Sequence, residues 1–208
     1  MRPPPADCWP VPGARVSSGY GWRQRPSGPD LHTGWDLPAR RGTPAVAVWP
    51  GRVVLSAASG YWHGYGELVV LHHPDLGLWT LYAHLDRRLV AGGQDVAKGQ
   101  PIGTVGSSAG TPEDPGRQLA NSRPHLHFEV LTRFPPRKRD ENRVNPVGLI
   151  AICTATRANR AQPPGISRRW EGHPTPRLAF PQRSSAGGAV LAVLAWLYVQ
   201  RQPRGSSR

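Results

Sequence analysis

Residues 125–130 read His-Leu-His-Phe-Glu-Val, and this alternation of polar and apolar residues constrains the fold more than any other segment. Successive side chains of a β-strand point to opposite faces of the sheet. A strand here therefore has an apolar and a polar face, formed by Leu126, Phe128 and Val130 and by His125, His127 and Glu129 respectively. The apolar face is expected to pack on a core, which leaves two imidazoles and a carboxylate together on the other side.

Residues 79–85, Trp-Thr-Leu-Tyr-Ala-His-Leu, predict a second strand of this kind. Regular alternation places Tyr82 and His84 on one face, whereas the opposite face holds Leu81, Ala83 and Leu85. Two separate strands are thus expected to present histidine from a face opposite their apolar residues.

Glycine and proline, each present 24 times among 208 residues, argue against a helix-rich fold. Both residues interrupt helices and favour turns, so we expect an all-β fold with many loops. Further strands are predicted at residues 46–49, 51–55 and 68–71, and the segment 96–105 is expected to hold a turn at 98–100 followed by a short strand. The turn sequence Pro-Asp-Leu-Gly at 74–77 predicts that 68–71 and 79–85 form a hairpin.

The composition divides the chain into five parts, which are a Pro-rich lead-in (1–14), a β-rich domain (15–150), an Arg/Pro/Ser-rich linker (151–185), an apolar run (186–199) and a basic tail (200–208). Most of the region after residue 150 is expected to be disordered. The apolar run has 14 residues, whereas a helix that spans a membrane needs about 20. It is interpreted either as a short helix docked on the domain or a partner, or as a short membrane anchor.

Three histidine motifs lie far apart in the chain, at residues 32–36 (His-Thr-Gly-Trp-Asp), 82–85 (Tyr-Ala-His-Leu) and 125–127 (His-Leu-His). One such motif has little weight, because a single histidine in a strand is usually structural. Together they supply the donors of a catalytic zinc site, which takes three protein ligands and keeps a fourth position for water. The predicted metal ligands are His32, Asp36 and His127. Beside the metal, two imidazoles remain for proton transfer and charge stabilisation, His84 and His125.

The chain resembles the lysostaphin-type (LytM-like) zinc metallopeptidases over roughly residues 10–150. An ordered series of motifs carries the resemblance, comprising residues 16–23 (Val-Ser-Ser-Gly-Tyr-Gly-Trp-Arg), 32–36, 81–85, 96–103, 124–129 and 144–146 (Val-Asn-Pro). The resemblance implies a compact antiparallel β-sheet domain with a substrate groove and one zinc ion. It also implies that the substrates are peptide cross-links or stem peptides of bacterial peptidoglycan.

The same resemblance assigns roles to individual residues. The family's zinc ligands fall on His32, Asp36 and His127, its general base falls on His125, and its transition-state-stabilising histidine falls on His84. All five positions are filled, whereas relatives that have lost ligands act only as activators of amidases. We therefore expect a zinc-dependent metalloendopeptidase, and the alternative is a non-catalytic wall-binding or amidase-activating module of the same fold.

The remaining polar residues near these motifs leave alternatives open. Structural roles are expected for the histidines outside the family's ligand positions, His63, His72, His73 and His173, although the segment 72–75 is also able to bind a metal. Glu129 shares a face with His127 and either supports the site from behind or is a solvated or ion-paired side chain. The segment 107–123 is longer than the family's Ser-Thr-Gly-Gly-like stretch, and it is expected to border the groove.

The formal charge of +13 is concentrated toward the C-terminus, with +5 over residues 1–150 and +8 over residues 151–208. A basic chain is attracted to polyanions, and the tail is expected to meet an anionic wall polymer or a membrane surface. No zinc finger or aromatic RNA-binding strand accompanies the charge, so a specific nucleic-acid partner is not expected.

Two features bear on location. Cys8 and Cys153 either form a disulfide, which requires an oxidising compartment, or are free thiols. The first residues lack the apolar stretch of an ordinary secretory signal. An extracytoplasmic or phage-associated enzyme, exported by another route or released by lysis, is the resulting expectation.

Overall fold

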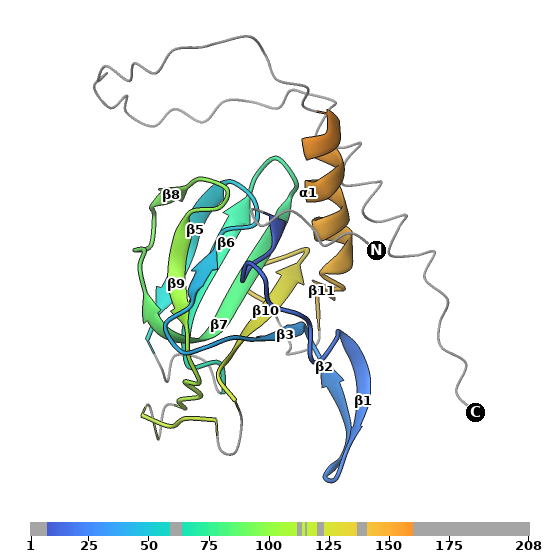
Figure 1. Ribbon diagram of the computed structural model, residues 1–208, viewed down its shortest axis with the longest axis vertical. Coiled ribbons are helices and arrows are strands. Elements are labelled where there is room, and N and C mark those ends of the chain that lie inside the picture. Colours follow the sequence, from blue (N-terminus) through green and yellow to red (C-terminus); the bar gives the residue numbers. More distant parts are fainter. Residues whose placement is uncertain are drawn as a thin grey trace, which may run out of the picture.

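The computed structural model describes residues 8–58, 64–111, 114, 116–119, 123–136 and 141–159. Within these ranges all strand pairings are antiparallel, and a single helix follows the strands (Figure 1). The elements are β1 (Gly21–Arg25), β2 (Gly28–His32), β3 (Trp35–Pro38), β4 (Pro44–Val46), β5 (Gly51–Ala57), β6 (Glu67–His73), β7 (Leu78–Arg88), β8 (Asp95–Val96), β9 (Pro101–Val105), β10 (His125–Leu131), β11 (Arg143–Val144) and α1 (Val147–Asn159). The all-β, antiparallel fold is thus confirmed, whereas the substrate groove stays a prediction.

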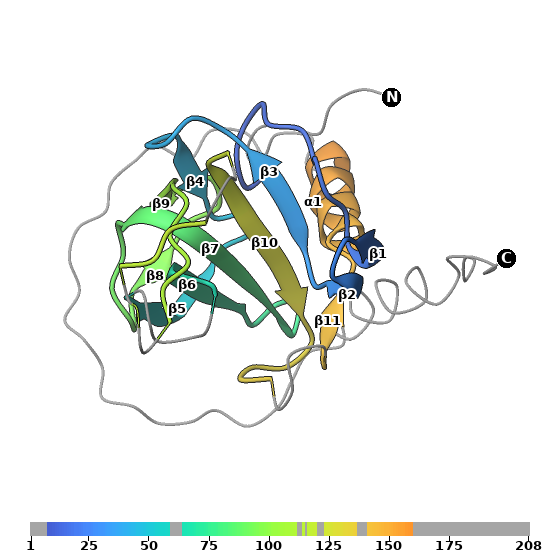
Figure 2. The same cartoon turned by 90° about the horizontal axis from the view of Figure 1, so that it is seen from below.

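The larger sheet places the two histidine-bearing strands, β7 and β10, side by side (Figure 1). Its main path runs β11-β10-β7-β6-β5-β8, with β3 paired to β10 and β9 paired to both β7 and β4. The hairpin predicted around residues 74–77 is confirmed as β6 and β7. Backbone hydrogen bonds from Leu76 to His73 and from Gly77 to Pro74 close its turn. Strands β1 and β2 form a separate hairpin that projects from the domain beside β3 (Figures 1 and 2).

The main core lies on the face of β10 that the sequence predicts to be apolar. Leu126, Phe128 and Val130 are at most 1% exposed, and they pack in one cluster with Tyr82 of β7. Burying a side chain of this size contributes about 1.5–3 kcal/mol to stability. The opposite face of the strand is also shielded from solvent, since Glu129 is fully buried. A second apolar cluster lies on that side of the sheet, formed by Ala57, Leu68, Val70, Leu81, Ala83 and Leu131.

His84 breaks the alternation predicted for residues 79–85. Its backbone is left-handed, with φ of 59°, and two residues of β7 oppose one residue of β6 at this point. A β-bulge of this kind redirects the side chains around it. Tyr82 and Leu85 therefore both pack in the main core, and His84 turns to the face of Ala83, where it meets His127. The prediction that His84 shares a face with Tyr82 was wrong. The bulge gives β7 one more residue than β6 between Tyr82 and Leu85, so the side chains no longer alternate there.

Helix α1 was not predicted from the sequence, and it crosses the domain boundary expected at residue 150. The Asn145 side chain accepts a hydrogen bond from Val147 N at 3.1 Å, and Pro146 follows the cap. Asparagine at the cap and proline at the first helical position are preferred helix starts. Leu149 and Ile150 are buried in the main core, so the helix is an integral part of the domain at the β10–β11 edge of the sheet (Figure 1).

A disulfide joins Cys8 to Cys153 of helix α1, with their Cα atoms 5.7 Å apart. Of the two alternatives for the cysteines, the structure has the crosslink. Cys8 and Val11 are buried, and the rings of Trp9 and Trp35 lie 5.4 Å apart. Residues of the predicted Pro-rich lead-in (1–14), Cys8 and Val11 among them, are therefore packed into the domain.

The tail after residue 159 lies outside the described residues. The predictions for the linker (151–185) beyond that point, for the apolar run (186–199) and for the basic tail (200–208) are therefore not addressed by the structure. In the part of the chain that is described, none of the helical segments has the length and apolar character to cross a membrane.

Candidate metal centre

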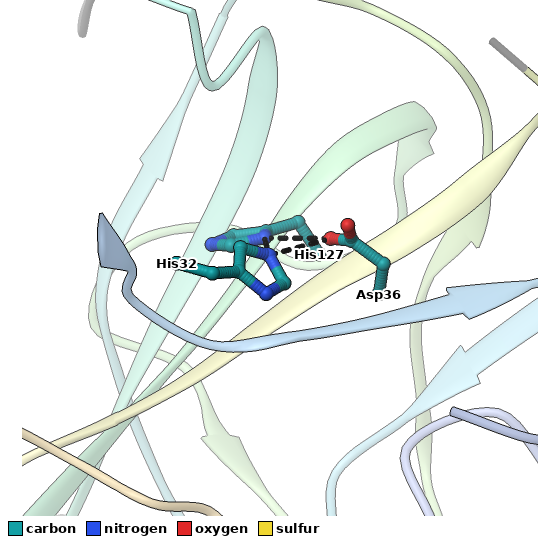
Figure 3. Close-up of side chains that lie close together, drawn as sticks. All are labelled: His32, Asp36 and His127. Atoms are coloured by element: carbon teal, nitrogen blue, oxygen red, sulfur yellow. Dashed lines mark hydrogen bonds and ion pairs between the residues drawn. The ribbon is translucent and has the colours of Figure 1, made fainter. Parts of the chain in front are cut away.

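Three of the predicted site residues bring one ligand atom each into a small triangle (Figure 3). Asp36 Oδ1 lies 3.0 Å from His32 Nε2 and 3.0 Å from His127 Nδ1, and the two nitrogens lie 3.3 Å apart. A zinc ion with bonds of about 2.1 Å at tetrahedral angles separates its ligand atoms by about 3.4 Å. The triangle is therefore close to the size that one tetrahedral zinc ion requires.

Strand pairing and one close backbone approach hold the three ligands together. Asp36 of β3 is the direct register partner of His127 of β10, and His32 ends β2 immediately before the turn into β3. Gly34 occupies that turn, and a Cβ atom on it would lie 2.3 Å from the Phe128 carbonyl oxygen. Only glycine allows this approach, which explains the residue in the middle of the His-Thr-Gly-Trp-Asp motif.

The hydrogen bonds behind the two histidines fix which nitrogens face the centre. His32 Nδ1 lies 2.6 Å from the Gly19 carbonyl oxygen, and His127 Nε2 lies 3.0 Å from Glu129 Oε1. Both partners accept, so these nitrogens carry the protons, and in neutral imidazoles His32 Nε2 and His127 Nδ1 hold lone pairs. With the Asp36 carboxylate, three electron-pair donors converge without a proton between them, an arrangement that fits a bound cation.

The electrostatics of the centre favour charged side chains despite their burial. Burial of Asp36 acts to raise its pKa, but hydrogen bonds from His127 and His32 outweigh it and lower the pKa well below its usual range. Burial of His127 acts to lower its pKa, but hydrogen bonds to Asp36 and Glu129 raise it to about 9. The two carboxylates thus give the centre a negative potential that favours a cation, either a proton on His127 or a metal ion in its place.

Glu129 lies behind His127 and is also ion-paired with Arg143, so it combines the two roles, support of the site and ion pairing, that the sequence left open as alternatives. Its carboxylate is fully buried and accepts hydrogen bonds from Thr33, from Tyr65 at 2.8 Å and from Arg143 Nε at 2.8 Å. Burial acts to raise the pKa of Glu129, but the bonds and charges of His127 and Arg143 lower it to about 2. The ionised carboxylate therefore fixes the orientation of a predicted metal ligand.

Arg143 and Tyr65 are supporting residues that the sequence analysis missed. Arg143 Nη2 donates to the Tyr65 hydroxyl at 3.1 Å, and the Tyr65 ring meets His127 edge-on at 5.8 Å. Burial and the Glu129 charge raise the pKa of Tyr65 to about 12, so its hydroxyl remains a donor. Arg143 directly precedes the Val-Asn-Pro motif at 144–146. This position next to a family motif is the sequence feature from which a role for Arg143 could have been predicted. No spacing rule links Tyr65 to the site.

Replacing Glu129 with glutamine is expected to raise the zinc dissociation constant about 10- to 100-fold, the usual cost of losing a partner behind a metal ligand. The neutral amide no longer pairs with Arg143 and no longer holds His127 as an ionised acceptor does. Competition for zinc with a chromogenic chelator measures the effect. Asp95→Asn is the matched control, since Asp95 pairs with Arg52 at the far edge of the sheet. An unchanged zinc affinity in Glu129→Gln would show that the carboxylate has no supporting role.

The two predicted catalytic histidines, His84 and His125, lie beside the three ligands. Their rings are 5.0 Å apart, the His84 ring is 5.7 Å from that of His127, and His125 Nε2 is 3.6 Å from Asp36 Oδ1. His84 Nδ1 donates to the Ser108 carbonyl at 2.8 Å, and His125 Nδ1 donates to that of Arg123 at 2.9 Å. Each neutral imidazole therefore has Nε2 as a free base.

The environments of these two histidines differ in solvent access. Burial of His84, together with the neighbouring His127 and His125, lowers its pKa to about 3. The His125 side chain is 12% exposed and lies at the start of β10. His84 is consequently neutral in the resting protein, and its left-handed backbone is the kind of local strain that concentrates at functional sites.

The described histidines outside the motifs have structural roles. His73 is fully buried and bonds the Pro50 carbonyl and the Thr80 hydroxyl. The His72 ring stacks on Trp79 at 4.5 Å. Neither belongs to the group of potential metal ligands found among the described residues. His63 and His173 lie outside the described ranges.

A family model described as peptidase family M23 matches residues 30–146. The chain belongs to peptidase family M23. The matched segment contains the three ligand residues and both neighbouring histidines, and it covers more than half of the chain. The resemblance inferred from the motifs is thereby confirmed.

Among curated M23 relatives, the DD-carboxypeptidase/endopeptidase Mpg of Neisseria meningitidis is 36% identical over 156 residues, covering 73% of this chain and 31% of Mpg. The murein hydrolase activator EnvC of Escherichia coli is 34% identical over 138 residues, covering 66% of this chain and 27% of EnvC. The chain thus spans about a third or less of these relatives. Similarity extends to both a peptidase and an activator.

Solved structures show the same fold. The catalytic domain of lysostaphin from Staphylococcus simulans is 26% identical with a TM-score of 0.54, covering 68% of this chain and 95% of that domain. A zinc-containing peptidase from Vibrio cholerae is 29% identical with a TM-score of 0.51, covering 66% of this chain and 38% of that protein. The M23 fold is therefore present, and one of the two proteins that share it contains zinc.

Proposed function

We propose that this protein is a zinc-dependent metalloendopeptidase that hydrolyses peptide cross-links or stem peptides of bacterial peptidoglycan. The observation that carries the proposal is the triangle of His32, Asp36 and His127 with two further imidazoles beside it. Family membership supports peptidase chemistry, and the similarity to the peptidoglycan DD-endopeptidase ShyB of Vibrio cholerae, 35% identical over 105 residues, supports a peptidoglycan substrate.

In this proposal His32, Asp36 and His127 hold the zinc, which when bound acidifies water and polarises the scissile carbonyl. His125 is the general base that takes the proton of the attacking water. Its Nδ1 is committed to the Arg123 carbonyl, which leaves Nε2 as a proton acceptor near Asp36. General base catalysis of this kind contributes about 10²–10⁴-fold to a rate.

His84 is proposed to stabilise the negative charge that develops on the carbonyl oxygen. The Ser108 carbonyl fixes the ring, so Nε2 faces away from that bond. His84 is neutral at rest, and a nearby negative charge favours its protonated form. For this role Nε2 takes up a proton from the solvent, and the resulting imidazolium donates a hydrogen bond to the charged oxygen, an interaction that stabilises the transition state rather than the ground state.

The alternative function is that of a non-catalytic activator or wall-binding module, and the similarity to EnvC favours it. The complete set of donors argues for catalysis, because an activator has no need of three ligands and two free imidazoles. Inactivity of the zinc-loaded protein on several types of cell wall, combined with stimulation of an amidase, would favour the activator.

We further propose that the protein works outside the cytoplasm, in the cell envelope, as a secreted protein or in association with a phage. Peptidoglycan lies there, and the Cys8–Cys153 disulfide suits an oxidising compartment. Contact of the basic tail with anionic wall polymer or a membrane surface is a proposal based on charge alone.

Mass spectrometry of the muropeptides released from purified sacculi tests the proposed function. The zinc-loaded protein is expected to release peptides with newly formed amino and carboxyl ends. A chelator should abolish the release, and added zinc should restore it. Release that is unaffected by a chelator would contradict a metal-dependent reaction, and amide-bond cleavage between sugar and peptide would point to an amidase instead.

A further inference from the structure

One face of the β1–β2 hairpin is directed at the metal centre and carries arginine. The register pairs Gly21 with His32 and Arg23 with Asp30, and paired residues of an antiparallel hairpin lie on the same face. Arg23 Nη1 lies 3.7 Å from Asp36 Oδ2. The arginine face of the hairpin, rather than the face of the exposed Trp22, is therefore the one next to the ligands.

Two guanidinium groups on this face share one carboxylate. Asp30 Oδ2 lies 2.9 Å from Arg23 Nη2 and 3.1 Å from Arg25 Nε. Two guanidinium groups have ten N–H donors between them, more than one carboxylate is able to accept. With Asp36 counted, the two arginines face two carboxylates, but N–H donors remain for a further acceptor on the more exposed Arg25.

Arg25 is the more accessible of the two arginines. Its side chain is 48% exposed, compared with 26% for Arg23, which also donates to the Ser18 hydroxyl at 2.7 Å. A series of ion pairs connects Asp36 to Arg25. The N–O distances are 3.7 Å for Asp36–Arg23, 2.9 Å for Arg23–Asp30 and 3.1 Å for Asp30–Arg25. An extended peptide advances about 3.3–3.6 Å per residue, so a substrate that lies along these contacts brings a group a few residues from the scissile bond to Arg25.

We propose that Arg25, positioned by Asp30 and Arg23, binds a free carboxylate of the substrate. This inference rests on the proposed function and narrows its substrate class. Stem peptides carry free carboxylates on acidic residues and chain ends, whereas a polyglycine bridge has none along its length. A guanidinium matches a carboxylate with two parallel hydrogen bonds. The substrate is accordingly a carboxylate-bearing stem peptide rather than a polyglycine bridge.

A pair of synthetic cross-linked stem peptides tests this proposal. The two differ only in that the carboxylates near the cross-link are free in one and converted to carboxamides in the other. The zinc-loaded protein is expected to cleave the free acid with a kcat/KM at least about 10-fold higher, the usual effect of a charge-assisted hydrogen bond. Equal rates on the two peptides, or faster cleavage of a pentaglycine peptide, would overturn the proposal.

Substitution of Arg25 locates the preference. In Arg25→Gln the ratio of the two kcat/KM values should fall toward one, and Arg25→Lys should retain part of it because the charge remains without the planar fork. Arg52→Gln is the matched control, since Arg52 is exposed and paired with Asp95 at the far edge of the sheet. A ratio that persists in Arg25→Gln would contradict the assignment.

Binding provides a readout independent of turnover. Calorimetry with the zinc-loaded His125→Ala variant is expected to give tighter binding of the free acid than of the carboxamide, and addition of Arg25→Gln should remove the difference. Retained binding preference without hydrolysis in the unsubstituted protein would contradict the proposed function but support the role of Arg25. Hydrolysis of both peptides without a preference for the free acid would support the proposed function but contradict the role of Arg25.

Discussion

Replacing His127 with alanine is expected to abolish zinc binding and peptide hydrolysis together. His127 supplies Nδ1 to the ligand triangle, and an open site with three protein ligands does not tolerate the loss of one. Loss of a partner behind a ligand already weakens affinity about 10- to 100-fold, so loss of the ligand itself should exceed 100-fold. Metal analysis after dialysis against a weak chelator, together with the muropeptide assay, measures both effects.

The fold of the His127→Ala variant should persist, because Glu129 keeps its bonds to Thr33, Tyr65 and Arg143. Thermal unfolding of the metal-free proteins tests that point. His72→Ala is the matched control, since His72 stacks on Trp79 away from the centre and should retain zinc. Stoichiometric zinc with normal turnover in the His127 variant would remove His127 from the ligand set.

Replacing Gly34 with alanine is expected to destabilise the protein by about 3 kcal/mol or more, at or above the upper end of ordinary overpacking. The added Cβ would lie 2.3 Å from the Phe128 carbonyl oxygen and 2.9 Å from its carbon. Both are backbone atoms of β10, so relief requires β3 and β10 to separate. Because Asp36 and His127 are register partners across this pair, zinc affinity should fall with stability.

Gly19→Ala provides the comparison for Gly34→Ala. Gly19 is also close to the centre, through its carbonyl bond to His32, but a Cβ there meets nothing within 4 Å. The free energy of unfolding of Gly19→Ala should differ from that of the unsubstituted protein by no more than about 0.5 kcal/mol, as for most substitutions that create no clash, cavity or unpaired polar group. Chemical denaturation with and without zinc measures both variants. Equal stability of the two would contradict the close-packing account of the His-Thr-Gly-Trp-Asp turn.

The predictable part of this site follows from short-range periodicity. Alternation in residues 125–130 assigns Phe128 to the core and His127 to the opposite face, and the structure agrees. The sequence motifs also name the three residues whose ligand atoms converge, although His32 and His127 are 95 residues apart. That convergence requires a three-dimensional template, which the family resemblance supplied and periodicity alone does not.

The features that escaped prediction depend on irregular or long-range structure. The bulge at His84 changes its face, and alternation rules assume an unbroken strand. Glu129 is buried only because Arg143, Tyr65 and Thr33 arrive from three other segments to satisfy it. Helix α1 had a recognisable start at Asn145, but the neighbouring Arg- and Pro-rich composition suggested a linker instead.

The most direct test of this account is a crystal structure of the zinc-loaded protein with the anomalous signal recorded at the zinc edge. One ion is expected within about 2.0–2.2 Å of His32 Nε2, His127 Nδ1 and an Asp36 oxygen, with water in the remaining position. His84 and His125 should flank the ion without binding it. Zinc held by other residues, or absent while these three side chains keep their places, would contradict the central claim.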